Sequence, residues 1–107
     1  MSNLTVDTLT NQDVQLAKAW VNFDGTGTVV INSAYNVSSI TDNGVGLFVA
    51  NTSLADNDAV ASVTANTLTG AQVAKVNSVS TTAIDVTVVN NGAFYDASLV
   101  LIIAFGN

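Results

Sequence analysis

The stretch that decides the fold is "SLVLIIAF", residues 98–105, near the end of a chain of 107 residues. Successive side chains of a strand point to opposite sides, which divides this stretch into Leu99, Leu101, Ile103 and Phe105 on one face and Val100, Ile102 and Ala104 on the other. Both faces are apolar, whereas a strand of a two-layer sandwich needs only one apolar face. We therefore predict that one face packs in the core and the other lies in or near a contact between copies of the chain.

We assign Val100, Ile102 and Ala104, together with Trp20, to this contact, and the face that holds Leu101 to the core. The alternative is a central strand whose second face is covered by a loop of its own chain.

Period-two patterns recur along the rest of the chain. "AKAWVNF", residues 17–23, places Ala17, Ala19, Val21 and Phe23 on one face and Lys18, Trp20 and Asn22 on the other. Further strands are predicted at 28–32, 35–41, 47–54, 59–68, 73–80 and 83–90. Turns are predicted at 24–27, 42–46, 69–72 and Asn91-Gly92, because asparagine and glycine accept the positive φ of tight hairpins. Within 42–46, the Asn43-Gly44 pair suits a type I′ turn.

The pattern contains no convincing helix. We predict an all-β fold, a single small antiparallel β-sandwich of about seven or eight strands, of jelly-roll or immunoglobulin-like type. It spans residues 16–107, and residues 1–15 form an arm or first strand that serves attachment.

Charged residues make up only 9% of the chain, against about 25% in an ordinary domain. Such a surface loses its water at little free-energy cost, which favours an oligomer. The alternative is a monomer whose surface is polar but uncharged. Two lysines face eight acidic residues, giving a net charge of −6, so we expect neither nucleic acid nor an anionic membrane as a partner. The chain has no proline to protect strand edges, and oligomerisation would cover them.

Catalysis and metal binding find little support in the residue inventory. The chain lacks His and Cys, and its only charged side chains are Asp and Lys, so a serine triad, a thiol nucleophile and an arginine clamp are impossible. Nothing marks Asp42 and Asp56 as a glycosidase pair. The "DND" loop at Asp56 and Asp58 reads as a solvated turn rather than a calcium site. We predict no enzyme activity, catalytic residue, metal or cofactor.

Targeting signals are also missing from the pattern. The start carries no basic segment followed by an apolar core, as a signal peptide would. The longest apolar run, residues 99–105, is far shorter than the roughly 20 residues of a membrane-spanning helix.

The strings "AKAWVNFDGTG" (17–27) and "NVSSITDNG" (36–44), with the ending "AFGN" (104–107), resemble a module of bacteriophage virion proteins, in particular tail-fibre-like and decorating proteins of marine and cyanobacterial phages. The resemblance implies an all-β, homotrimeric structural protein, made in the host bacterial cytoplasm and exposed on the virion surface. After Gly46 the chain departs from the module, where "LFVANTSLADNDAVASV" replaces a longer tyrosine-rich segment.

From this resemblance we expect a small trimeric capsid decoration or cement protein. Its arm, through Leu4, Val6, Leu9 and Val14, would add a strand to the major capsid protein or another virion protein. The alternative is the tip or adaptor of a tail fibre that recognises a bacterial surface glycan, with Trp20, Tyr35 or Tyr95 stacking on a sugar.

Overall fold

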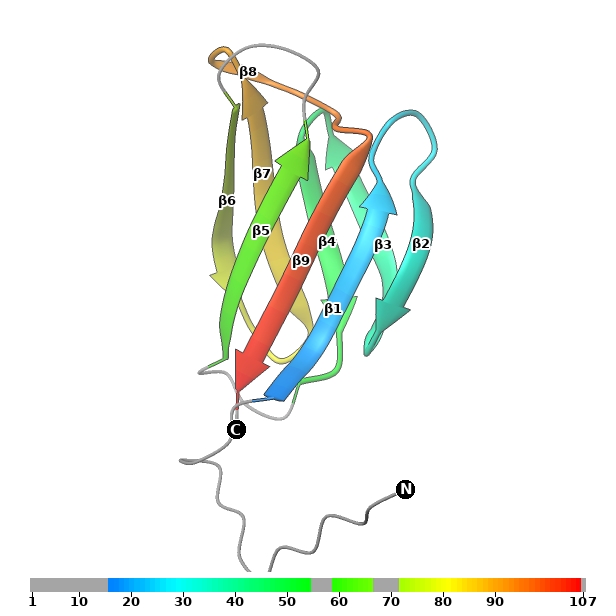
Figure 1. Cartoon of the computed structure of the whole chain (residues 1–107), viewed down its shortest axis with the longest axis vertical. Coiled ribbons are helices and arrows are strands. Elements are labelled where there is room, and N and C mark those ends of the chain that lie inside the picture. The colour runs from blue at the N-terminus through cyan, green and yellow to red at the C-terminus, as the bar shows by residue number, and fades with distance from the viewer. Residues whose placement is uncertain (1–15, 55–58, 67–71, 107) are drawn as a thin grey trace, which may run out of the picture.

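The computed structural model describes residues 16–54, 59–66 and 72–106, which form two antiparallel sheets packed face to face as a sandwich (Figure 1). One sheet has the strand order β2-β1-β9-β5; the other has the order β3-β4-β7-β6, with the short β8 paired to β7. The strands are β1 (Leu16–Asp24), β2 (Val30–Tyr35), β3 (Val37–Gly44), β4 (Leu47–Thr52), β5 (Val60–Asn66), β6 (Gln72–Val79), β7 (Ala83–Asn90), β8 (Ala93–Phe94) and β9 (Leu99–Gly106).

The predicted all-β, sandwich-like architecture is confirmed, and the described residues contain no helix. It follows that no described helix is long and apolar enough to pass through a membrane. The predicted arm and its residues Leu4, Val6, Leu9 and Val14 lie outside the described residues.

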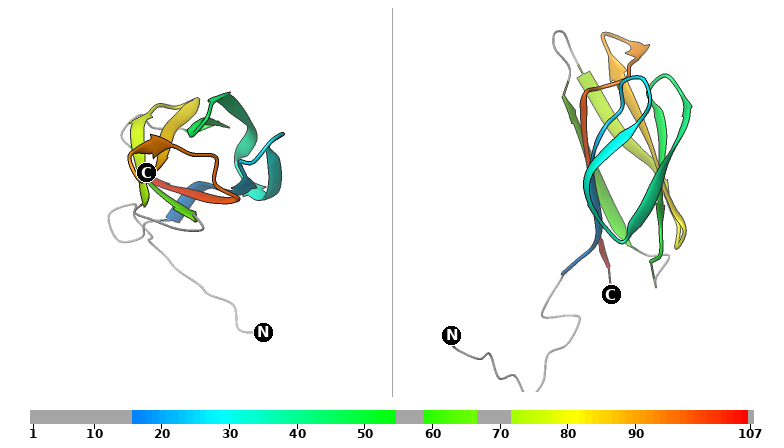
Figure 2. Two further views of the ribbon diagram at one scale, coloured as in Figure 1. Left: turned by 90° about the horizontal axis from the view of Figure 1, so that it is seen from above. Right: turned by 90° about the vertical axis from the view of Figure 1, so that its right-hand side faces the viewer.

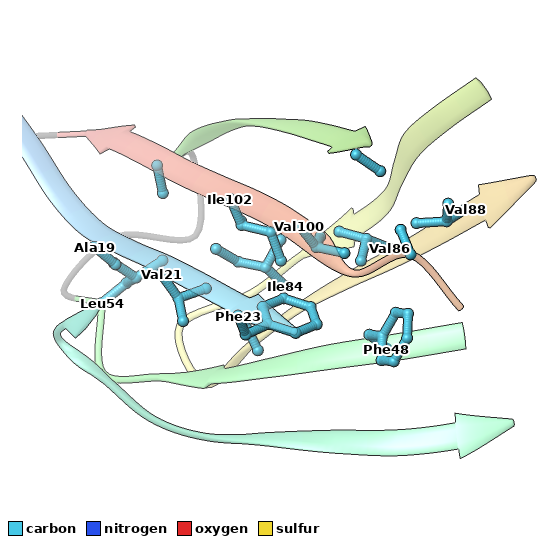
Figure 3. Close-up of a cluster of buried hydrophobic side chains, with 14 residues drawn as sticks. Ala19, Val21, Phe23, Phe48, Leu54, Ile84, Val86, Val88, Val100 and Ile102 are labelled. Atoms are coloured by element: carbon cyan, nitrogen blue, oxygen red, sulfur yellow. The ribbon is translucent and has the colours of Figure 1, made fainter. Parts of the chain in front are cut away.

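The two sheets face each other in both views of Figure 2, and the buried side chains of the core lie between them, as Figure 3 shows. Phe23 of β1 meets Phe48 of β4 edge to face, with ring centroids 5.2 Å apart at an interplanar angle of 70°. The largest fully buried side chains come from both sheets: Phe23, Phe48, Ile84, Ile102, Val21, Val86, Val88 and Val100.

This core corrects the assignment of faces on β9. Val100, Ile102 and Ala104, predicted to face a neighbouring copy, are buried inside the subunit. The pairing explains why: Ile102 lies directly opposite Val21 of β1, whose side chain also faces the other sheet. Leu101 therefore points outward, opposite to the prediction.

A β-bulge at the start of β1 corrects a second prediction. Ala17 pairs with Phe105 but Ala19 pairs with Ala104, so Lys18 is the extra residue between them. The inserted residue breaks the strict alternation. As a result Ala17 shares the outward face of Phe105 instead of the buried face of Ala19.

The two asparagine-glycine turns differ. Asn91 and Gly92 form the predicted turn: both have positive φ, 54° and 83°, as a type I′ turn requires, and they join β7 to β8. The turn predicted at residues 42–46 is present, but Asn43-Gly44 is not its central pair, because β3 continues through Gly44 and the chain reverses at residues 45 and 46. Gly46 has the positive φ there, 72°.

Position 46 requires a glycine for two reasons: its φ is positive, and the backbone of β7 approaches it closely. Its N–H donates to Asp96 Oδ1 at 2.8 Å, and its carbonyl accepts the Val88 N–H at 2.8 Å. A Cβ at this position would lie 2.4 Å from the Val88 carbonyl oxygen. Gly46 therefore ties the β3–β4 hairpin to β7 and to the connection that leads into β9.

The chain passes from the first sheet to the second at Asn36, between β2 and β3. Asn36 has φ 57°, a left-handed conformation that asparagine tolerates better than most residues. Its side-chain N–H group donates to the carbonyls of Lys18, at 3.0 Å, and Ser53, at 2.8 Å. This side chain therefore links the end of the β4 region to β1 across the sandwich edge.

Candidate functional site

The candidate site is the outer face of the β2-β1-β9-β5 sheet, the side of β1, β9 and β5 turned toward the viewer in Figure 1. Residues directly opposite each other on paired strands share a face, so the strand register gives its composition row by row. We call the following residues the apolar face: Ala17, Trp20, Tyr35, Val60, Leu101, Ile103 and Phe105.

Three rows cross this face. The first holds Ala17, Phe105 and Val60; the second holds Tyr35, Trp20, Ile103 and Ser62; the third holds Ser33, Asn22, Leu101 and Thr64. The centre is therefore the apolar stripe of β9. On one side of it lie the rings of β1 and β2, and on the other side the smaller residues of β5.

The stripe is open to solvent in the single subunit. Leu101, Ile103 and Phe105 are 37–40% exposed, although they sit on an inner strand of the sheet. Trp20 is 38% exposed and Val60 is 70% exposed. A continuous exposed surface of large apolar side chains marks a contact site more often than an ordinary protein surface.

A shallow hollow crosses the same face. Side chains from all four strands line it, with Trp20 and Asn22 on one side, Ser62 and Thr64 on the other, and Leu101 at its centre. The asymmetry between rings on one flank and small side chains on the other produces this shape.

The outer face of the second sheet has a different chemistry over its middle. Asn51 Nδ2 donates to the hydroxyls of Ser39 and Thr41, at 2.9 Å each, and Asn77 Nδ2 donates to Thr87 Oγ1 at 2.6 Å. Asn51, Ser39, Thr41 and Asn77 keep part of their surface open to solvent, whereas Thr87 is buried beneath its neighbours. A smaller exposed apolar group, Val73 and Phe94, lies at one end of that sheet.

Charge is arranged around the apolar face rather than on it. In the three rows defined by the described strands, no position holds a charged residue. On β1 the charged residues are Lys18, in the bulge, and Asp24, the last residue of the strand. The hydroxyl and then the backbone N–H of Thr26 donate to Asp24 Oδ1, and these hydrogen bonds hold the pKa of the Asp24 carboxyl below its usual value.

Of the residues predicted for the contact between copies, only Trp20 lies on the apolar face, because the other three are in the core. Tyr35, predicted as a sugar-stacking residue, lies directly opposite Trp20. Tyr95 is elsewhere: it is partly buried in the connection between β8 and β9, where its N–H donates to the Val88 carbonyl at 3.1 Å.

Sequence reasoning missed the outward role of Leu101, Ile103 and Phe105 and the position of Val60. A signal for it was present in β5. There, Ser62 and Thr64 alternate with the apolar Ala61, Val63 and Ala65, which fixes the polar side of β5 as the outer one. Once β5 is paired with β9, the residues opposite Ser62 and Thr64 must also face outward.

The acidic residues do not gather in the described parts of the chain. No three side chains of the metal-binding types come together there. Asp56 and Asp58, the residues of the "DND" loop, lie outside the described residues.

Comparison with known proteins gives no match: no protein-family description, curated protein or solved structure corresponds to the chain.

Proposed function

We propose that this chain is a structural subunit of a bacteriophage particle: a small decoration or cement protein that coats the head shell as a homotrimer. The observation that carries the proposal is the apolar face, an exposed and uncharged sheet surface that suits a subunit covered by neighbours. The phage context is supported by the resemblance of "KAWVNFDGTG" and "NVSSITDNG" to virion modules.

The finer fold type, a jelly-roll or immunoglobulin-like sandwich, is part of the same proposal. Its support is that the chain changes sheet after β2, β4, β5 and β8. Connections that pass between sheets in this way are characteristic of Greek-key sandwiches.

Attachment to the shell is proposed for residues 1–15. The described part of the chain begins at Leu16, which pairs with Gly106 at the end of the sandwich where β9 finishes (Figure 1). An extended segment with spaced apolar residues can add a strand to the edge of a partner's sheet. The proposed partner is the major capsid protein or another virion protein.

The test is to locate the protein in an electron-microscopy map of the phage and to measure binding of the purified chain to heads that lack it. We expect density on the head surface. Full-length chains with Leu4→Asp and Leu9→Asp should bind heads at least tenfold more weakly while keeping the mass of the unsubstituted assembly. Absence of the chain from purified particles would contradict the proposal.

A second candidate function, glycan recognition by a tail-fibre tip or adaptor, is favoured by one observation. Trp20 and Tyr35 are exposed cross-strand neighbours, with Asn22 and Ser33 in the next row as hydrogen-bonding groups. Aromatic faces beside polar side chains are suited to stacking on a sugar. If this function holds, the purified chain adsorbs to host cells and competes with infection, and Trp20→Ala together with Tyr35→Ala removes both effects.

A further inference from the structure

We propose that a second copy of this chain packs on the apolar face. The symmetry axis that relates the copies runs parallel to β9, in front of this face. The inference rests on the proposed function in one respect, namely that the protein works as an assembled subunit. It adds the surface by which copies meet and the strands that face each other.

The size of the face fits a contact between subunits. With roughly 150–250 Å² for each large side chain, the exposed parts of its six larger members total on the order of 500 Å². The largest apolar patch of a typical monomer measures about 300–600 Å² and is often functional. With its polar rim of Asn22, Ser33, Ser62 and Thr64, the face approaches the roughly 800 Å² that each partner buries in a specific contact.

The charge distribution favours another copy as the occupant. The chain carries a net charge of −6, so copies repel each other over most of their surface. The three rows of the apolar face hold no charged residue among the described positions, so two such faces meet without placing like charges opposite each other.

The two flanks of the face are complementary to each other. An axis along β9 places the β1 flank of one copy over the β5 flank of the next at the same height along the strands. Trp20 then meets Ser62, Ala17 meets Val60, and Asn22 meets Thr64, the partners in each case lying in the same row on opposite sides of β9.

These three contacts match in kind. A large ring lies over a small hydroxyl side chain in the hollow, an apolar residue faces an apolar residue, and an amide faces a hydroxyl. An axis across the strands would instead set β1 against β1, ring against ring. A threefold axis along β9 gives the matched contacts, and so does a twofold axis in that direction.

Cross-linking tests the arrangement directly, because the chain has no cysteine of its own. In the full-length double variant Asn22→Cys/Thr64→Cys, oxidised glutathione should join the β1 flank of one copy to the β5 flank of the next. Each bridge forms as two thiols lose two protons and two electrons, and glutathione disulfide is reduced to two thiols.

A bridge within one subunit is ruled out by geometry. Asn22 and Thr64 flank Leu101 on opposite sides of β9, so two strand spacings of about 4.8 Å separate them. A disulfide needs Cα atoms within about 7 Å. Any bridge in the double variant therefore joins two copies.

We expect the double variant to run on a non-reducing gel at three subunit masses for a threefold axis, or at two for a twofold axis. Neither single variant should cross-link efficiently. Efficient dimers from Asn22→Cys alone would place β1 against β1 and overturn the proposed axis. Failure of the double variant to cross-link at any concentration up to about 100 μM would overturn the contact itself.

A charge substitution supplies the matched control. Ile103→Asp should reduce the sedimenting mass at micromolar concentration to one subunit, because an aspartate at the centre of the face would be buried without a partner. Val73→Asp makes the same kind of change at an exposed apolar residue of the other sheet and should leave the mass unchanged. Far-UV circular dichroism checks folding, with Phe105→Ser as the milder second variant.

The result is independent of the phage. If the purified chain cross-links as expected but is missing from particles, the virion role fails and the contact stands. If the chain is present in particles but sediments as one subunit and does not cross-link, the contact fails and the virion role stands. Binding of a monomer to host-cell glycan through Trp20 would assign the face to sugar and overturn the inference.

Discussion

Two neighbouring isoleucines of β9 should respond very differently to truncation. Ile102 is 2% exposed and faces the core, whereas Ile103 is 37% exposed and faces outward. Replacement of Ile102 by Ala removes three buried carbons, at about 0.8 kcal/mol each, and leaves a cavity that the sheets close only in part. We expect Ile102→Ala to lower the free energy of unfolding by about 3–4 kcal/mol.

The same truncation at Ile103 leaves no closed cavity in the isolated subunit, because one side of the residue is open to water. We expect Ile103→Ala to lower the unfolding free energy of the dilute subunit by about 1 kcal/mol, less than the transfer value of three buried carbons. A domain of this size has only about 5–15 kcal/mol in total, so the two variants are readily separated.

Urea unfolding followed by far-UV circular dichroism measures both changes, at several protein concentrations. Association adds stability by mass action, so the effect of Ile103→Ala should grow with concentration while that of Ile102→Ala stays constant. The denaturant slope should be the same for both variants. Equal losses, or a larger loss for Ile103→Ala in the dilute subunit, would refute the assignment of faces on β9.

Two further predictions concern the loops. In the same urea assay, Gly46→Ala should lower the free energy of unfolding by at least about 2 kcal/mol more than Gly27→Ala does. The reason is that a Cβ at Gly46 would lie 2.4 Å from the Val88 carbonyl oxygen, whereas a Cβ at Gly27 would have no atom within 4 Å. Equal losses of unfolding free energy in the two variants would exclude the close approach at Gly46. The pKa of Asp24 is lower in the folded protein than its value of about 4 in the unfolded chain, so the ionised carboxylate stabilises the fold above pH 4, and this stability is lost as the pH falls through the folded pKa. Asp24→Asn should therefore lose less stability than the parent protein between pH 6 and pH 2. An identical pH dependence of the two proteins would contradict the role of the Asp24 hydrogen bonds.

Strand positions were predictable because period-two alternation is a local property. Residues 19–23, 83–90 and 99–105 alternate as expected, and Asn91-Gly92 makes the expected turn because few other pairs accept positive φ at both positions. At Asn43-Gly44 the same local rule failed. The Asp42 carboxylate accepts a hydrogen bond from the Gly44 N–H at 3.1 Å within β3. The chain reverses instead at Gly46, where the Val88 carbonyl oxygen leaves no room for a Cβ.

From the sequence, the candidate site was predictable only in that the last strand has an apolar face more than a two-layer sandwich can bury. In 99–105 both faces are apolar, so alternation defines the two faces without telling which one is buried. That choice depends on the neighbouring strands, since Val21 and Val63 lie directly opposite Ile102. The bulge at Lys18 depends equally on pairing and leaves no mark in the alternation itself.

The contrast between the two outer faces bears on function because both belong to one subunit with one core. The outer face of the β3-β4-β7-β6 sheet mixes hydrogen-bonded groups such as Asn51 and Thr41 with apolar residues such as Val49. Packing of the sandwich therefore does not require a continuous apolar stripe on an outer face. The fold alone therefore does not explain why the exposed residues Leu101, Ile103 and Phe105 are apolar. Exposed apolar residues lower solubility, and the negative charge spread over the chain offsets this effect. Exposed residues of this kind, in an uncharged region of an acidic protein, are best explained by a contact that the single subunit leaves open.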